Sequence, residues 1–398
     1  MGRDSVANKL FLPGMKHHPV IGVIGGGQLG RMFIEEAQRY EVDCIIADAD
    51  KNCPASGIAT RHIVGSISAR EPILALAAAC DVLTYEIEHI FVDTLLELEA
   101  KGTKLIPSPG ILRMVQDKGL QKTFFRENNI PTSDFEIVNS PSEWLAALDR
   151  LKCKKIAAKL CREGYDGKGV SILRVQDIRA HPESIPFQAP SVLEQFISCE
   201  KELSVIVARD AKGKVACYPC VEMEFDEKAN LVKYLLSPAR INRKIRNKAA
   251  QIATRLVKKM NGVGLFAVEM FLDKKGNVLV NEVAPRPHNS GHHTIEACYT
   301  SQYEQLLRIV LGLPLGSTRQ LQPAVMLNLL GPEGLNGPYR LEGMEELLKI
   351  EGVYVHLYHK QESRPMRKLG HITILGNSVK EVKTKAARVS RAYRIVAA

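Results

Sequence analysis

The most regular pattern of hydrophobic and polar positions lies in residues 264–284, where two apolar runs flank a short polar turn. The runs are Gly264 to Leu272 (GLFAVEMFL) and Val278 to Ala284 (VLVNEVA), and the turn DKKGN contains the glycine typical of a hairpin. We therefore predict an antiparallel β-hairpin. If Leu272 pairs with Leu279 across the turn, the same register sets Glu269 directly opposite Glu282.

Two opposed glutamates need compensation. Directly opposed residues in an antiparallel pair have Cβ atoms about 5 Å apart, and like charges there are destabilising. Mg²⁺ bound by one or two carboxylates plus substrate phosphates is the usual form in phosphoryl-transfer sites. We therefore predict that Glu269 and Glu282 bind Mg²⁺. Two alternatives stay open, because the glutamates can be solvated on an exposed sheet face or a one-residue bulge can break the register.

The run APRPHNSGHH (284–293) follows the second strand and adds many hydrogen-bonding side chains. Such a density of polar groups in one turn indicates a site. A second polar segment points the same way, since KKIAAK (154–159) predicts a strand ending in Lys159 and the loop GYDGKG (164–169) follows. Glycines let a backbone fold over a ligand, and its N–H groups can then cradle phosphate oxygens. A glycine-rich turn with a stray lysine has the same pattern.

Residues 191–204 (SVLEQFISCEKELS) predict a further strand, with Glu194 and Glu202 spaced along it. Acidic groups near an adenosine can accept hydrogen bonds from its ribose hydroxyls, and we expect the backbone of Gln195 to Ile197 to bind the adenine edge. A long basic amphipathic helix is predicted for Asn242 to Met260, packed under the hairpin. Short strands are predicted later in the chain, at 353–359 and 371–375.

The amino-terminal pattern is different. The apolar strand Pro19 to Ile24 precedes Gly25, Gly27 and Gly30 in the order G-x-G-x-x-G, and the strand CIIAD ends in Asp48. This spacing is the dinucleotide-binding fingerprint, so an NAD-dependent oxidoreductase is an alternative function. The rest of the chain argues against it, because hydride transfer has no use for a phosphate loop or a carboxylate pair.

Composition bounds the class of protein. The chain has 398 residues, of which 45% are hydrophobic and 25% charged, as in a globular protein of two or three domains. No apolar run approaches the ~20 residues of a transmembrane helix, and the first residues lack the apolar region of a secretory signal. The nine cysteines are scattered, and the single CxxC at Cys217 and Cys220 lacks a second pair at zinc spacing. We expect reduced thiols in a cytoplasmic protein.

The net charge of +10 suggests a nucleic-acid-binding protein as another alternative. Basic clusters lie at 240–248 and 380–394. Aromatic residues make up only 6% and are not interleaved with the basic ones. We therefore expect solvated helix faces, part of whose charge steers polyanionic nucleotides toward the site, and no nucleic-acid partner.

Four motifs together resemble one family. The motifs GGGQLGRM, GYDGKG, LEQF, and AVEMF with NEVAPRPHNSGH are similar to those of the 5-(carboxyamino)imidazole ribonucleotide synthases, which are ATP-grasp enzymes. The likeness runs from about Pro19 to the carboxyl end. Biotin carboxylases and formate-dependent glycinamide ribonucleotide transformylases share the two-glutamate ATP site but not the APRPHNSGH run in this form. A ligase like the formate-dependent one is the remaining alternative within the superfamily.

The resemblance implies an α/β ATP-grasp fold and a reaction. ATP, bicarbonate and 5-aminoimidazole ribonucleotide would give the carboxyamino product through carboxyphosphate, in purine biosynthesis, with Mg²⁺ as cofactor and a homodimer as the assembly. The implied domains are an unstructured extension (1–18), a Rossmann-like domain (19–117), the ATP-grasp domain (118–315, with a lid at 135–200) and a small β-rich domain (316–398).

The resemblance also assigns residues. Those implied for ATP are Lys118, Lys159, Gly164, Tyr165, Asp166, Gly167, Lys168, Gly169, Glu194, Gln195, Phe196, Ile197, Glu202, Asn281 and Glu282. Those implied for the ribonucleotide are Glu86 or Glu88, Tyr165, Asp166, Lys168, His288, Asn289, Ser290, Lys360 and Arg367. The catalytic set is Asp166 (a candidate proton acceptor), Lys168 and Arg286, the last near the carboxyphosphate. His288 can instead be a capping or core histidine, and Lys360 and Arg367 can belong to a solvated loop.

The chain departs from the family pattern at three positions. The family typically has arginine where Lys118 stands, tryptophan where His293 stands and glutamine where Val170 ends the glycine loop. The first difference keeps the charge. The other two put fine substrate contacts in doubt but not the reaction.

Overall fold

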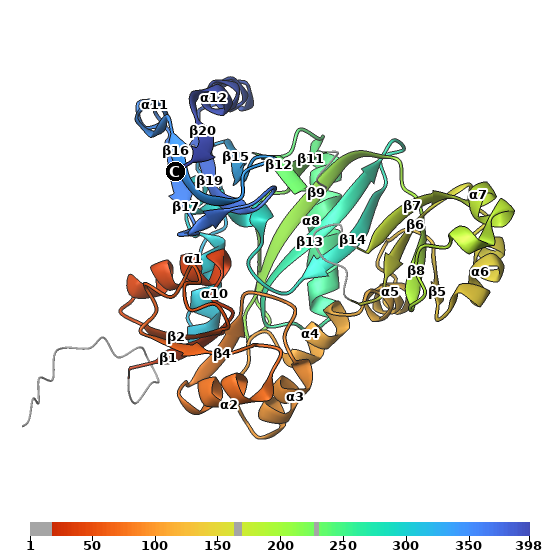
Figure 1. Cartoon of the computed structure of the whole chain (residues 1–398), viewed down its shortest axis with the longest axis horizontal. Helices are drawn as coiled ribbons and strands as arrows, with labels where there is room; N and C mark the ends of the chain where they lie inside the picture. The colour runs from red at the N-terminus through yellow and green to blue at the C-terminus, as the bar shows by residue number, and fades with distance from the viewer. Residues whose placement is uncertain (1–17, 163–168, 227–230) are drawn as a thin grey trace, which may run out of the picture.

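The computed structural model describes residues 18–162, 169–226 and 231–398. A four-stranded parallel sheet opens the chain (Figure 1), in the order β3 (Arg61–Val64), β2 (Asp43–Asp48), β1 (Val20–Ile24), β4 (Val82–Tyr85). Three helices accompany it: α1 (Gln28–Gln38), α2 (Arg70–Ala78) and α3 (Val92–Ala100). Strands that run parallel need such crossover helices, so this part of the chain is a Rossmann-like layer. The two strands predicted here are confirmed.

Two helices lead out of the first sheet, α4 (Pro109–Val115) and α5 (Lys118–Glu127). The Asp117 side chain caps α5 by accepting from the N–H groups of Gly119 and Leu120. In Figure 1, α5 lies between the large central sheet and a smaller sheet at the edge of the molecule. It is therefore the joint between two parts of the fold.

The smaller sheet, which we call the lid sheet, is antiparallel, with the order β5 (Phe135–Val138), β8 (Ser191–Gln195), β6 (Lys155–Leu160), β7 (Val170–Arg174). The helices α6 (Trp144–Leu151) and α7 (Val175–Ala180) cover one face, with short 3₁₀ turns at η1 (Pro141–Glu143) and η2 (Pro182–Ser184). Trp144, Leu148, Ile156 and Leu193 are buried in a hydrophobic core of their own. The lid sheet is thus a separate packing unit.

The central sheet has nine strands. Its order is β14 (Val278–Ala284), β13 (Gly264–Asp273), β9 (Cys199–Arg209), β11 (Val221–Asp226), β12 (Leu231–Ser237), β15 (Ala324–Leu330), β19 (Lys368–Leu375), β17 (Val353–Leu357), and β10 (Val215–Cys217) pairs with β9. The predicted hairpin is β13 and β14. Since β15 pairs with β12, the sheet continues without a break across the boundary predicted near residue 316.

The two faces of the central sheet have different partners. The helix α8 (Arg243–Lys259) buries Ala253, Leu256 and Val257 in the same core as Leu203 and Val268 of the sheet. This confirms the helix predicted to pack under the hairpin. Because side chains alternate along a strand, Glu202 and Ser204 of β9 face away from α8. That second face carries the candidate site.

The remaining elements close the fold. They are η3 (Asn289–Gly291), α9 (Thr294–Ala297), α10 (Gln302–Leu311), β16 (Gly337–Glu342), α11 (Met344–Leu348), β18 (Glu362–Ser363), α12 (Val379–Ala392) and β20 (Arg394–Ala397). The helix α10 joins the first and central sheets, since Tyr303 and Leu306 share a core with Phe33 of α1 and Leu265 of β13. None of the helices in the described ranges is long and apolar enough to span a membrane, and all nine cysteines are free.

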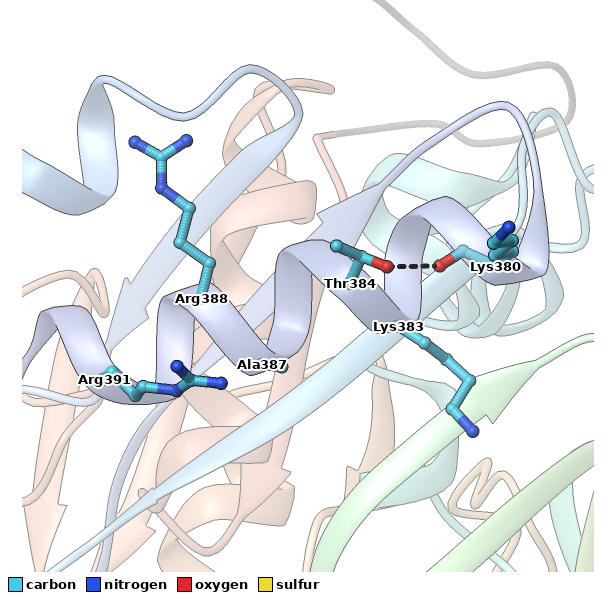
Figure 2. A pocket seen from close by; sticks show the side chains of 6 residues that line it. All are labelled: Lys380, Lys383, Thr384, Ala387, Arg388 and Arg391. Carbon is cyan, nitrogen blue, oxygen red and sulfur yellow. Dashed lines mark hydrogen bonds between the residues drawn. The ribbon is translucent and has the colours of Figure 1, made fainter.

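The basic cluster at 380–394 lies largely on α12. This helix buries Val382, Ala386 and Val389, and its opposite face forms a shallow groove (Figure 2). The groove is lined by Lys380, Lys383, Thr384, Ala387, Arg388 and Arg391. A helix with one buried apolar face and one exposed basic face is an ordinary amphipathic surface helix. The packing of α12 on the sheet therefore accounts for the charge pattern of this segment.

Candidate active site

The hairpin does bring the two glutamates together. Glu269 pairs with Glu282, as predicted, but Leu272 pairs with Val278 rather than with Leu279. The register shifts by one residue between Glu269 and Met270, where Asn281 is the extra residue of a β-bulge. The predicted pairing at the turn was therefore wrong by one residue, and the bulge restores the opposition of the carboxylates.

A third carboxylate lies beside this pair. Ser204 of β9 pairs with Glu269, so Glu202, two residues earlier, shares the same face of the sheet. Burial, together with the charges of Glu269 and Glu282, raises the pKa of the Glu202 carboxyl to about 7. Three carboxylates therefore lie on one face of the sheet.

Cationic groups approach these carboxylates. The Lys118 ammonium lies 3.3 Å from Glu282 Oε2, and its charge lowers the pKa of that carboxyl. Lys159 Nζ donates to Asn281 Oδ1 at 2.8 Å, and His288 Nε2 lies 3.2 Å from Glu269 Oε1. Two lysines from different elements therefore meet at Asn281 and Glu282 of β14, and we call this part of the site, with Glu269, the cleft.

This donor set fits Mg²⁺. An ionised Glu282, the opposed Glu269 and the amide oxygen of Asn281 are hard oxygen donors of the kind this ion prefers. Within the described ranges, no group of three or more histidine, cysteine or acidic side chains forms a metal site by itself. A site with one or two carboxylates is the kind in which substrate phosphates complete the coordination of Mg²⁺.

The polar run after β14 forms a hydrogen-bonded support. His288 Nδ1 accepts from the Ser290 backbone N–H at 3.2 Å and lies 2.8 Å from Ser290 Oγ, which leaves Nε2 to donate to Glu269. The Ser290 hydroxyl is 2.8 Å from that of Ser204 and is fully buried. We therefore revise the role predicted for Ser290 from substrate contact to support of His288. The buried Asn289 amide has no hydrogen-bond partner among the described residues.

The Glu194 side chain is enclosed by other residues of the protein. It is 3% exposed, its Oε1 lies 2.8 Å from Lys159 Nζ and its Oε2 accepts from Lys122 and Ser133 at 2.7 and 2.6 Å. The predicted contact between this carboxylate and the ribose is corrected accordingly. The nearby backbone is also partly used, because the N–H groups of Gln195 and Phe196 donate to carbonyl oxygens of Asp134 and Lys155.

In the glycine turn after β1, carboxylates of this protein occupy the backbone N–H groups. Glu86 accepts from the N–H groups of Gly27 at 2.7 Å and Gly30 at 3.1 Å, and Asp48 accepts from Gly26 at 2.7 Å. A Cβ on Gly27 would lie 2.5 Å from Glu86 Oε1, so glycine is needed here for the carboxylate to approach. Donors that hold a pyrophosphate in dinucleotide-binding folds are already satisfied. The structure therefore disfavours NAD binding and gives Glu86 a structural role.

Glu88, the alternative to Glu86 for substrate, lies 3.0 Å from the Arg286 guanidinium. Lys360 and Arg367 come from the opposite end of the chain. Burial lowers the pKa of Lys360 and the Arg367 charge lowers it further, whereas Glu86 and Asp48 raise it. Lys360 therefore interacts with Arg367 and with the carboxylates at the glycine turn, and a phosphate oxygen is a suitable partner for such a pair of cations.

Several predicted residues need separate mention. Gly164, Tyr165, Asp166, Gly167 and Lys168 lie outside the described residues. Gly169 is described, with a φ of +73° and with its carbonyl accepting from the Leu160 N–H. Phe196 and Ile197 are half-buried between β8 and β9, and the Lys155 ammonium lies 3.9 Å from the Phe196 ring centroid.

Sequence reasoning missed two residues that the structure connects to the site. Lys122 is 3% exposed and binds Glu194, and Ser204 binds Ser290. Lys122 had a signal, because it follows Lys118 by four residues and therefore lies on the same side of α5. Ser204 had none, since a lone serine in a strand is unremarkable.

Sequence models of three protein families match the chain. They are the Ribonucleotide synthetase preATP-grasp domain at residues 18–116, the ATP-grasp domain at 123–303 and the Phosphoribosylaminoimidazole carboxylase C-terminal domain at 324–385. The fold and the two-glutamate cleft thus define an ATP-grasp protein.

Individual relatives narrow this class. The N5-carboxyaminoimidazole ribonucleotide synthetase structure from Thermotoga maritima is 42% identical, has a TM-score of 0.86 and aligns over 96% of this chain and 100% of its own. An Aspergillus clavatus N5-carboxyaminoimidazole synthase structure in complex with ADP and 5-aminoimidazole ribonucleotide is 34% identical, with a TM-score of 0.83 and coverage of 94% and 98%. This chain belongs to the N5-carboxyaminoimidazole ribonucleotide synthase family.

Some relatives are longer. The chloroplastic phosphoribosylaminoimidazole carboxylase of Vigna aconitifolia is 40% identical over 380 residues, which make up 92% of this chain but 66% of that protein. The chain therefore spans slightly less than two thirds of the length of this plant relative.

Proposed function

We propose that this protein is an ATP-dependent carbon–nitrogen ligase that carboxylates 5-aminoimidazole ribonucleotide in purine biosynthesis. Bicarbonate and ATP give carboxyphosphate and ADP, and the ribonucleotide amine then takes the carboxyl group and releases phosphate. The observation that carries the proposal is the meeting of Lys118 and Lys159 with Glu282 and Asn281 at the β14 bulge. Phosphoryl transfer depends mainly on such positioning and charge neutralisation.

The first step needs an ATP with its terminal phosphate held for attack. The Lys118 and Lys159 ammonium groups would bind phosphate oxygens, and the Glu269 and Glu282 carboxylates would hold Mg²⁺. The metal would neutralise charge that develops on the phosphates. A bicarbonate oxygen would then bond to the terminal phosphorus while the bond to ADP breaks.

The second step needs the amine and the carboxyphosphate in one water-poor pocket. Arg286, held 3.0 Å from Glu88, would stabilise the anionic carboxyphosphate. Lys360 and Arg367 would bind the phosphate of the ribonucleotide, and the unpaired Asn289 amide supports substrate contact at the run after β14. The nitrogen would bond to the carboxyl carbon, the bond to phosphate would break and the amine would lose a proton. Asp166 as its acceptor and Lys168 as a phosphate ligand stay predictions, as do a homodimer and a cytoplasmic location.

The test is an ADP-release assay with substrates omitted one at a time. We expect ADP to form only when ATP, Mg²⁺, bicarbonate and 5-aminoimidazole ribonucleotide are all present, with one carboxylated product per ADP. Formate in place of bicarbonate, with glycinamide ribonucleotide as the acceptor, is the control for the other ATP-grasp reaction. ADP release that ignores the ribonucleotide, or that follows formate, would contradict the proposal.

A further inference from the structure

A closed ring of polar contacts joins the lid sheet to the central sheet. Lys122 of α5 donates to Glu194 of β8, and Glu194 binds Lys159 of β6. Lys159 donates to Asn281 of β14. The ring closes through Thr132, whose hydroxyl accepts from Lys122 at 2.7 Å and donates to the carbonyl of Val280, the residue before Asn281, also at 2.7 Å.

The members of this ring come from α5, β8, β6, β14 and the segment that precedes β5. A backbone bridge between Thr132 and Val280, with the Val280 N–H donating to the Pro131 carbonyl at 2.7 Å, fixes the same junction. Ser133 adds a further hydrogen bond to Glu194. In Figure 1 this junction lies where α5 passes between the lid sheet and the β13–β14 edge of the central sheet. The ring therefore sets the position of the lid sheet relative to the metal-binding hairpin.

Lys122 differs from the other two lysines of the cleft. Its side chain is 4% exposed, against 12% for Lys159 and 23% for Lys118. A nucleotide phosphate can therefore reach Lys122 less easily than the other two lysines. Burial lowers the pKa of Lys122 to about 8. Burial alone would raise the pKa of Glu194, but the charges of Lys159 and Lys122 outweigh it and bring that pKa to about 2. Glu194 is thus an anion shared between the more deeply buried Lys122 and the more exposed Lys159.

We propose that Lys122 is a positioning residue, which acts through Glu194 to hold the Lys159 ammonium at the phosphate-binding point of the cleft. Without Lys122, both oxygens of Glu194 are left to Lys159 and Ser133. Lys159 is then drawn toward Glu194 and away from Asn281. Removing one partner of a buried ion pair leaves an uncompensated charge, and Lys159 is the remaining cation in contact with Glu194. The inference rests on the proposed function only in that Lys159 contacts a phosphate of ATP.

The test is nucleotide binding to Lys122→Met, which keeps the length of the side chain but removes its charge. We expect affinity for Mg²⁺–ADP to fall at least tenfold, while affinity for adenosine, which lacks phosphates, changes less than twofold. Calorimetry measures both without any carboxylation, so failure of the proposed function and failure of this inference are distinguishable. Equal losses for both ligands, or no loss for ADP, would overturn the inference.

A double-mutant cycle tests the link to Lys159. Lys122→Met should have no further effect on ADP affinity when Lys159→Met is already present, and independent, multiplying losses would overturn the inference. If Lys122→Met fails to fold, the double variant Lys122→Met with Glu194→Gln is measured instead. Its second substitution removes the carboxylate that Lys122→Met leaves uncompensated. Lys201→Met is the matched control. It breaks another lysine–glutamate contact of 2.7 Å, to Glu222, outside the ring, and should leave ADP affinity unchanged.

Discussion

The glycine turn after β1 and the cleft beside β14 both combine carboxylates with groups that could bind phosphate, yet they are built in opposite ways. In the turn, the N–H groups of Gly26, Gly27 and Gly30 donate to Asp48 and Glu86 of the same domain. In the cleft, the carboxylate of Glu282 faces the lysine Lys118 from a separate element. The N–H groups of these three glycines are all hydrogen-bonded within their own domain, whereas the cleft brings together charged side chains from separate elements.

This difference shows what a motif determines. The spacing G-x-G-x-x-G requires a tight turn between strand and helix, and the structure has one. It does not determine what occupies the N–H groups, which here depends on Glu86, distant in sequence. In the proposed function, Lys118 would exchange its partner Glu282 for a phosphate and Glu282 would exchange Lys118 for a cation, so neither charge would be left unpaired. A ligand site needs donors that are available for exchange.

The largest effect that we expect comes from removing a cleft carboxylate. Glu282→Gln should lower turnover by roughly 100-fold or more, because charge stabilisation in a preorganised site is a large term in catalysis. Glu269→Gln should do the same. ADP release at saturating Mg²⁺ measures both. Near-parental turnover in either variant would show that the pair is an ordinary feature of the sheet.

Stability measured without metal separates the two variants. Glu269→Gln removes repulsion between opposed carboxylates, and its amide oxygen can still accept from His288, so stability should be unchanged or rise by a fraction of ~1 kcal/mol. Glu282→Gln leaves Lys118 without its anionic partner and should not stabilise. Urea unfolding of the metal-free proteins provides the comparison.

The next effect tests the other half of the comparison. Glu86→Ala removes the acceptor of two N–H groups at the start of α1, and an unsatisfied buried donor costs about 1–3 kcal/mol. We expect a loss of roughly 3 kcal/mol in the free energy of unfolding, since water can enter part of the space. Thermal or urea unfolding measures it. Glu35→Gln, a partly exposed change on the same helix, is the control and should have a much smaller effect.

The parent protein, in which Glu86 closes the glycine turn, tests the rejected oxidoreductase function. If the turn is closed by Glu86, NAD and NADP should not shift the melting temperature of the parent protein, whereas Mg²⁺–ATP should raise it. Stabilisation by a dinucleotide in the parent protein would show that the turn is an available site and that the contrast with the cleft is false.

The sequence predicted the hairpin well because its pattern is local. Alternation and a glycine turn were sufficient to predict β13 and β14, and the opposition of Glu269 and Glu282 followed. The bulge at Asn281 could not be predicted, because an extra residue in one strand leaves the hydrophobic pattern nearly unchanged. The pairing of Glu269 with Glu282 was predicted correctly because two differences cancel: the strands pair one residue away from the predicted register at the turn, and the bulge shifts the register back by one residue.

Burial and long-range contacts were the main failures. Glu194 and Glu202 look equivalent in sequence, but two lysines and a serine enclose the first, and the second lies beside two other carboxylates. The sheet that continues from β12 to β15 was also missed, since strand order depends on contacts between distant segments. Local patterns therefore predicted the elements and the residue types of the site, while the partner of each charge required the structure.

The last effect that we expect concerns Glu202 and has a defined pH window. Its pKa rises from 4.5 to about 7 on folding because of burial and the neighbouring carboxylates, so the folded protein binds more protons than the unfolded chain between these values. The stability that Glu202 contributes is fully present below pH 4.5 and is lost as the pH rises through about 7. Each pKa unit is worth about 1.4 kcal/mol, so the loss is at most roughly 3 kcal/mol and smaller where solvent screens the charge.

Glu202→Gln removes this titration. We expect the variant to be more stable than the parent at about pH 8 and equal to it at about pH 4, by urea unfolding without metal or nucleotide. The exposed Glu200→Gln, on the same strand, is the matched control and should show no such pH-dependent difference. A cation at Glu269 and Glu282 would neutralise charges that help to raise this pKa. Mg²⁺–ADP should therefore reduce the difference in the free energy of unfolding between parent and variant at high pH. A stability difference that is the same at both pH values would mean that Glu202 does not share the charge of the pair, and the cleft would then be no more than the sum of separate surface charges.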